Sequence, residues 1–174
     1  MIIYKDVVSN DEIVADTFKL KDSEKFPLVL WECDCRKYTK RVGGENFELA
    51  GANPSAEDAE EDDGGEGEFK MVHDIEDQFR LNWLQDEYKP SKSDFEVHLK
   101  KYLKMLSKRD ARSDDWKKQA AGALKYILKN YDNFDVMMGE SMNGEAMHVL
   151  IDFREDGVTP FATIWKDGLF EEKV

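Results

Sequence analysis

The sequence predicts an α+β fold in which an antiparallel sheet carries a helical hairpin. Three observations lead to this. Residues 134–169 contain three segments of strand character separated by two turn signals, residues 92–131 contain two capped helical stripes, and residues 43–68 are dominated by acidic residues and glycine. We therefore expect a single domain over residues 1–174, with a mobile acidic loop at 43–68 and a projecting helical hairpin at 92–131.

The C-terminal segment predicts a three-stranded meander. Glu155-Asp156-Gly157 is a turn signal, Pro160 opens the next strand at a position where no ladder donor is lost, and Asn143-Gly144 marks the earlier turn. Residues alternate from 147 to 154, and because the second face is mixed we expect only one side to meet the core. The first face holds Met147, Val149, Ile151 and Phe153, and the second holds His148, Leu150, Asp152 and Arg154.

The N-terminal half predicts further strands. Residues 2–8 are β-branched and aromatic, and Ser9-Asn10-Asp11 ends them with residues that hydrogen-bond their own backbone. Residues 12–20 fit either a short helical turn or a bent strand. We expect one strand over 28–41 and another, of period two, over 69–83. The acidic segment would then be an excursion between two strands of one domain.

Two helices follow. Ser93-Asp94-Phe95-Glu96 is a capping-box sequence that starts the first, and Ser113 caps the second, with Asp114 and Asp115 favourable at the positive end of its dipole. Apolar residues recur at helical spacing in both segments. The connecting turn at residues 109–112 is short, so the two helices must form an antiparallel hairpin.

Composition excludes several classes of protein. The 174 residues are 41% hydrophobic, enough to build a core, and the net charge of −13 argues against a nucleic-acid or anionic-membrane partner. No apolar run approaches the roughly 20 residues that span a bilayer, and the N-terminus lacks the form of a signal peptide. We expect a cytoplasmic protein.

The charge is unevenly distributed. Residues 92–131 hold eleven basic and five acidic residues, whereas residues 57–68 hold eight acidic residues among twelve. A basic hairpin is commonly only a solvated helix face. The functional alternative is a cationic surface for an acidic partner, such as a tubulin tail or the chain's own acidic loop. That surface would consist of Lys100, Lys101, Lys104 and Lys108.

No catalytic or metal-binding pattern is present in the sequence. We find no nucleophile motif, phosphate loop or zinc-protease motif. Cys33 and Cys35 are the only cysteines, and two thiolates make half a zinc site, so we expect structural or incidental thiols and no metal; a redox or metal role is the alternative. The acidic segment permits weak calcium binding without the spacing of an EF-hand, so we expect no cofactor beyond that.

Five ordered blocks resemble one family. They are MIIYKDVVSNDE, AGANPSAED, FDVMMGES, LIDFREDGVTPF and KDGL, and together they are similar to the translationally controlled tumour protein family over the whole chain. The resemblance implies a β-tent of antiparallel strands with a helical hairpin and a mobile loop. That fold is related to a small zinc-bearing Rab-binding exchange protein and to methionine sulfoxide reductases of the B type, but this chain lacks their four-cysteine zinc site.

The resemblance also implies partners. Family members bind tubulin and microtubules, calcium, translation elongation factors, anti-apoptotic Bcl proteins and the Rheb small GTPase, and some are nuclear or exported without a signal peptide. Glu12 matches the glutamate implicated in GTPase contact, although it also fits an ordinary charge in a first helical turn. Residues 11–31 overlap the segment implicated in Bcl binding, but the text LVLWECDC at residues 28–35 departs from the family pattern, which weighs against that partner.

Two functional classes follow from these observations. The favoured one is a non-enzymatic, monomeric regulatory adaptor of growth and survival that acts on a small GTPase of the Rheb class, including as an exchange factor. The alternative is a calcium- and microtubule-binding or chaperone-like protein without a GTPase role.

Overall fold

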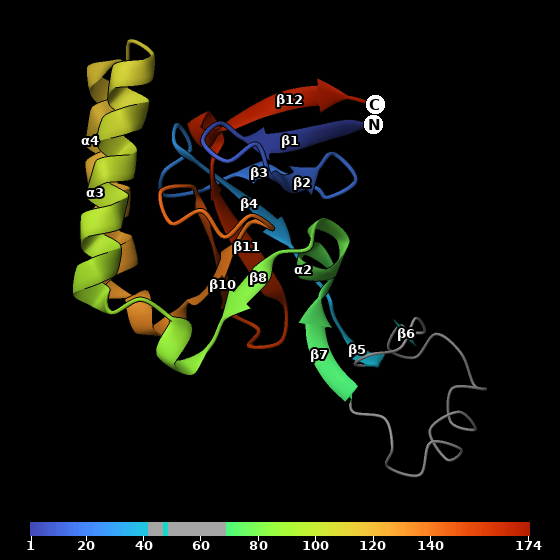
Figure 1. Ribbon diagram of the computed structural model, residues 1–174. Helices are drawn as coiled ribbons and strands as arrows, with labels where there is room; N and C mark the ends of the chain where they lie inside the picture. Colours follow the sequence, from blue (N-terminus) through green and yellow to red (C-terminus); the bar gives the residue numbers. More distant parts are fainter. Residues whose placement is uncertain (42–46, 49–68) are drawn as a thin grey trace, which may run out of the picture.

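The computed structural model describes residues 1–41, 47–48 and 69–174. Its strands form antiparallel sheets, and two long helices stand side by side at one edge of the molecule (Figure 1). The prediction of an α+β fold is confirmed. The predicted acidic loop, residues 43–68, lies outside the described residues except for the two-residue strand β6 (Phe47–Glu48).

The described strands form three sheets. The largest has the order β3 (Lys21–Asp22), β4 (Leu30–Asp34), β11 (Pro160–Trp165), β10 (His148–Phe153), β9 (Asp135–Met138) and β8 (Asn82–Leu84). A second has the order β12 (Leu169–Lys173), β1 (Ile2–Asp6) and β2 (Glu12–Ala15), and a third the order β6, β5 (Lys37–Arg41) and β7 (Phe69–His73). The two ends of the chain lie together because β1 pairs with β12 (Figure 1).

The predicted C-terminal meander is present as β9, β10 and β11, but the expectation of one-sided burial is wrong. Four consecutive residues of β10, from His148 to Ile151, are buried. Phe95 of the helical hairpin meets the His148 ring edge-on at 5.8 Å, so a helix covers the face that we expected to be open. Burial on both faces requires a covering element, and the alternation within one strand carries no information about it.

Residues 28–41 form two strands in different sheets, not one. The break falls at Cys35 and Arg36, which are held by partners distant in sequence. The Cys35 N–H donates to the Pro160 carbonyl at 2.8 Å, and the Arg36 N–H donates to the Asp74 carboxylate at 3.0 Å. Strands β5 and β7, which precede and follow residues 42–68, pair with each other. For residues 12–20 the sequence fitted either a short helical turn or a bent strand. The structure has strand β2 over the first four of these residues.

The prediction of one strand over residues 69–83 is also wrong. This segment is strand β7, helix α2 (Asp74–Phe79) and strand β8. The Glu76 carboxylate accepts from the His73 N–H at 3.2 Å at the start of the helix, and Arg80 ends it with a left-handed conformation. Ile75 and Phe79, four residues apart, are buried, and this spacing also fits the period of two that we inferred.

The helical hairpin consists of α3 (Lys92–Arg109) and α4 (Asp114–Lys129). Ser113 caps α4 as predicted, by accepting from the Trp116 N–H at 3.1 Å. The cap of α3 is Ser91 and not Ser93, because the Ser91 hydroxyl accepts from the Asp94 N–H at 3.2 Å. The described residues also contain three short 3₁₀ turns: η1 (Asp86–Tyr88), η2 (Tyr131–Asn133) and η3 (Lys166–Gly168). Among the described residues, no helix has the length and apolar character needed to cross a bilayer.

Candidate functional site

Glu12 begins β2 and its side chain is exposed. It lies at the rim of a polar hollow of about 320 Å³, formed where the β1–β2 turn meets the end of α2 and the loop after β9. We call this the Glu12 hollow. Its lining residues are Lys5, Asn10, Asp11, Glu12, Gln78, Phe79, Arg80 and Glu140.

The turn before Glu12 is clamped by a buried carboxylate. Asp6 is only 1% exposed and accepts from the N–H groups of Val8 and Met147, both at 2.8 Å. Burial raises the pKa of Asp6, and these hydrogen bonds oppose that effect. Asn10 adopts φ 65°, which asparagine tolerates, and its N–H donates to the Asp6 carbonyl at 2.8 Å. The turn therefore has a defined shape.

A second contact docks this turn on the loop after β9. The Asp11 carboxylate accepts from the Ser141 hydroxyl at 2.7 Å and from the Ser141 N–H at 3.2 Å. Gly139 makes the approach possible, since a Cβ there would lie 2.8 Å from the Asp11 Cβ and closer still to its carboxylate. Ser141, which is 130 positions away in sequence, thus holds the backbone of the turn directly before Glu12.

The charges of the hollow are partly paired. Arg80 and Glu140 form an exposed ion pair at 3.1 Å, and Lys5 pairs with Glu172 at 2.8 Å, which raises the pKa of Lys5. Glu12 makes no ion pair or side-chain hydrogen bond within the described ranges. Sequence reasoning singled out Glu12 but not Arg80 or Glu140. No local signal indicated that the end of α2 and the loop after β9 would meet β2.

The predicted basic surface divides in two. Lys100 forms an ion pair with Glu96 at 2.7 Å on its own helix. Lys101, Lys104 and Lys108 lie with Met105 and Arg109 around a shallow hollow of about 560 Å³ and form no ion pair with any residue that the structure describes. We call these five residues the basic face. Sequence reasoning missed Met105 and Arg109, although the spacing of 101, 105 and 109 places them in one row on a helix.

An apolar hollow of about 390 Å³ adjoins the basic face and shares Lys101 and Met105 with it. Val97, which is 57% exposed, and Val8 contribute to its apolar lining, while Asp94 and Glu145 place carboxylates beside it. This face of α3 therefore combines exposed apolar groups with a row of cations.

The two cysteines lie in the core. Cys33 and Cys35 are free thiols, 0% and 4% exposed. Two effects raise the pKa of the Cys35 thiol and keep it protonated. The larger is a side-chain hydrogen bond with Cys33, and the next is burial. A protonated thiol is a poor nucleophile and a poor metal ligand. The described residues contain no group of three or more candidate metal ligands.

The three histidines are neutral at pH 7. Burial lowers the pKa of His73 to about 4 and that of His148 to about 3, and it also lowers the pKa of His98. Their rings pack on aromatic neighbours: His73 lies 5.3 Å from Trp83, and His98 lies 4.2 Å from His148. His73 and His148 are core residues, whereas His98 is partly buried and lines the apolar hollow.

Comparison with known proteins gives concordant matches over the full length. A family profile described as translationally controlled tumour protein matches residues 1–170. The chain is 58% identical over 183 aligned positions to the translationally-controlled tumor protein homolog of Aspergillus fumigatus and 56% identical to that of Emericella nidulans, with all of each chain covered.

Two solved structures share the fold. The translationally controlled tumor-associated protein p23fyp from Schizosaccharomyces pombe matches with a TM-score of 0.75 at 38% identity, and both chains are fully covered. The Caenorhabditis elegans translationally-controlled tumor protein matches with a TM-score of 0.65 at 24% identity, covering 100% of this chain and 99% of that one, which is a likeness of fold.

Proposed function

Because the chain belongs to the translationally controlled tumour protein family, we propose that it is a cytoplasmic, non-enzymatic regulatory protein that contacts a small GTPase of the Rheb class through Glu12. The supporting observation is the way Glu12 is presented. Its carboxylate is exposed and unpaired among the described residues, at the start of an edge strand whose preceding turn is fixed by Asp6 and by the Asp11–Ser141 contact.

Preorganisation matters because ordering a side chain at an interface opposes binding by about 0.5–1.5 kcal/mol. The Glu12 side chain still bears that cost, but the turn that precedes it is already held by Asp6 and by the Asp11–Ser141 contact, so no loop has to be ordered as well. An exchange factor stabilises the nucleotide-free GTPase. A carboxylate presented in this way would compete with the nucleotide phosphates for the lysine of the GTPase phosphate loop.

A nucleotide-release assay tests this proposal. Glu12→Val should reduce stimulated release to the rate of the GTPase alone, with an unchanged melting temperature because the substitution is exposed. Asp16→Val is the matched control, since Asp16 is an exposed acid directly after the other end of β2. Equal release rates for the wild type, both variants and the GTPase alone would remove the exchange function.

A second candidate function rests on the basic face. Lys101, Lys104, Lys108 and Arg109 form a row of cations around Met105, and the adjoining apolar hollow offers room for an apolar side chain. This arrangement suits an acidic protein segment such as a tubulin tail, or an acidic region of an elongation factor. The partner would be steered by charge and anchored by apolar contact.

Charge reversal separates these two interactions. Changing Lys101, Lys104 and Lys108 together to Glu should abolish salt-sensitive microtubule co-sedimentation and leave nucleotide release unchanged. Lys100→Glu is the control, because Lys100 already pairs with Glu96. If Lys100→Glu weakened co-sedimentation as much as the triple change, general charge and not the basic face would be responsible.

Calcium and Bcl-type partners stay outside this proposal. The acidic residues that would supply weak calcium ligands, at 57–68, fall outside the described residues. Within the segment implicated in Bcl binding, Val29 and Leu30 are buried, and β4 lies between β3 and β11. A partner would have to open the largest sheet to reach that part of the segment.

A further inference from the structure

A further cleft lies apart from the Glu12 hollow, the basic face and the apolar hollow beside it, and it shares no lining residue with any of them. It has a volume of about 660 Å³ and lies between residues 21–26, the C-terminal part of α4 and the β10–β11 hairpin. The first of these segments is fixed to α4: the Leu28 N–H donates to the Gln119 side chain at 2.8 Å, and Phe26 lies against Gly122.

The cleft is lined by aromatic rings and by two hydroxyl groups, those of Tyr126 and Thr163, that make no hydrogen bond within the described part of the chain. Phe26, Tyr126, Phe153 and Phe161 contribute rings to its walls. Thr163 lines the same cleft and is only 6% exposed, and its hydroxyl makes no hydrogen bond with any described residue. The Thr163 hydroxyl is not fully closed off from solvent, so it can hydrogen-bond to water or to a ligand that enters the cleft, and a ligand that leaves it unpaired would be disfavoured.

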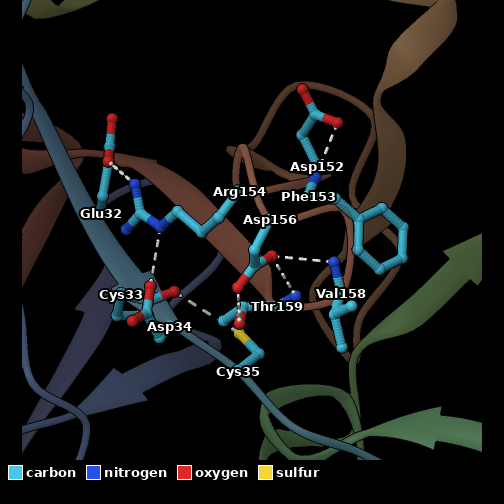
Figure 2. Close-up of polar contacts among 10 residues, drawn as sticks. All are labelled: Glu32, Cys33, Asp34, Cys35, Asp152, Phe153, Arg154, Asp156, Val158 and Thr159. Atoms are coloured by element: carbon cyan, nitrogen blue, oxygen red, sulfur yellow. Dashed lines mark hydrogen bonds and ion pairs between the residues drawn. The ribbon is translucent and has the colours of Figure 1, made fainter.

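The protein's own cations already stack on these rings. The Lys25 ammonium lies 4.3 Å from the centre of the Tyr126 ring, and the Arg154 guanidinium lies 4.0 Å from that of Phe161. The second contact is the more informative one. Figure 2 shows Arg154 reaching to the carboxylates of Glu32 and Asp34, at 2.6 and 2.8 Å, so that one planar group stacks on a ring and also binds two carboxylates.

Charge in the cleft is negative overall, with six carboxylates against three cations. Several carboxylates are already occupied: Asp22 pairs with Lys166, and Asp156 accepts from the Val158 and Thr159 N–H groups in its own turn (Figure 2). Glu24 and Glu155 are exposed at the rim and make no ion pair within the described part of the chain. These two carboxylates are available to an incoming cation.

We propose that this cleft docks an arginine-containing basic segment of a partner protein. A guanidinium entering it would stack on an aromatic wall and pair with Glu24 or Glu155, as Arg154 does with Phe161, Glu32 and Asp34. The hydroxyl of Thr163 would accept a hydrogen bond from the ligand. Arginine suits the cleft better than lysine because its planar fork both stacks and binds carboxylates in two directions.

Peptide titration of the full-length protein tests the proposal. The probe is an acetylated and amidated Arg-Phe-Arg peptide, and its neutral counterpart replaces both arginines by citrulline, which preserves the shape. We expect amide shifts at Phe26, Tyr126, Phe153 and Thr163 with the arginine peptide and none with the citrulline peptide. Spermidine, a flexible polyamine without a planar group, should bind at least about fivefold more weakly.

Two variants locate the binding site. The double variant Glu24→Lys with Glu155→Lys should weaken binding at least about fivefold. Both side chains are exposed, and the change replaces the carboxylates that would pair with the incoming guanidinium by cations that repel it. Glu87→Lys with Glu171→Lys is the control of equal charge change, at exposed positions outside the cleft. Thr163→Val keeps the side-chain shape and should weaken binding severalfold without lowering the melting temperature.

Three results would overturn the proposal. They are shifts centred outside the cleft, equal weakening by the two double variants, and binding of spermidine as tight as that of the arginine peptide. The second would indicate attraction to the net negative charge alone. Loss of GTPase or microtubule binding would not bear on it, because the cleft shares no residue with those surfaces.

Discussion

The carboxylate of Asp11 accepts a hydrogen bond from the hydroxyl of Ser141 at 2.7 Å, although the two residues are 130 positions apart. The contact joins the β1–β2 turn to the loop that follows β9. It places Glu140, the residue before Ser141, at the same hollow as Glu12. The turn that precedes the candidate GTPase-binding residue is therefore held by a contact between two segments far apart in the chain.

Removing that carboxylate should loosen the turn. Asp11→Ala loses hydrogen bonds to a charged acceptor, which typically contribute about 1.5–3 kcal/mol each when they are shielded. The contact is exposed, so we expect a loss of about 1–2 kcal/mol in the free energy of unfolding, measured by urea denaturation. Hydrogen exchange of the Ser141 amide should become faster. An unchanged exchange rate would show that the contact does not hold the loop in solution.

Gly139 should tolerate no side chain. Gly139→Ala would place a methyl group against the Asp11 side chain and displace it from Ser141, and we expect it to lower stability by about 1–3 kcal/mol. Gly144→Ala is the matched control in the same loop, because a Cβ there meets nothing within 4 Å. Comparable urea midpoints for the two variants would contradict the close approach of Asp11.

Cys33 and Cys35 should matter for packing and not for partner binding. Both are buried, so replacing both by Ala should lower the free energy of unfolding by about 1–3 kcal/mol in total. Nucleotide release and microtubule binding should be unaffected. Metal analysis of the purified protein checks the other reading: stoichiometric zinc that disappears in the double variant would show that the thiols are ligands.

Acid should destabilise the protein through its buried histidines. The folded-state pKa values, about 4 for His73 and about 3 for His148, lie below the 6.5 of an unperturbed histidine. The unfolded chain therefore binds protons that the folded state excludes. The stability that these groups contribute is present above about pH 6.5 and is lost as the pH falls toward 4 and then 3.

The pH dependence of the urea midpoint tests this prediction. His148→Leu and His73→Leu should each give a flatter profile than the wild type between pH 6.5 and 4, whatever their stability at neutral pH. His98→Leu should have a smaller effect, since His98 is only partly buried and the lowering of its pKa by burial is opposed by the Ala146 backbone and by the charge of Glu145. Parallel profiles for all four proteins would mean that the histidines are not buried in the neutral form.

The sequence alone determined the elements whose signals are local. The C-terminal strands follow from alternation bounded by Glu155-Asp156-Gly157 and Pro160, and α4 follows from the Ser113 cap and its apolar stripe. Both signals act within a few residues, so no knowledge of the rest of the chain was needed. Family membership and the exposed, turn-following position of Glu12 were likewise accessible from the sequence.

Only the tertiary structure decided which residues of an alternating segment form a strand and which form a helix. Residues 69–83 become strand, helix and strand because Asp74 bonds to Arg36 and because Ile75 and Phe79 find the core on one helical face. The residues that line the Glu12 hollow, and those that line the cleft between residues 21–26, α4 and the β10–β11 hairpin, could not be predicted from the sequence either. Each is assembled from segments far apart in the chain, and periodicity and capping carry no information about which segments meet.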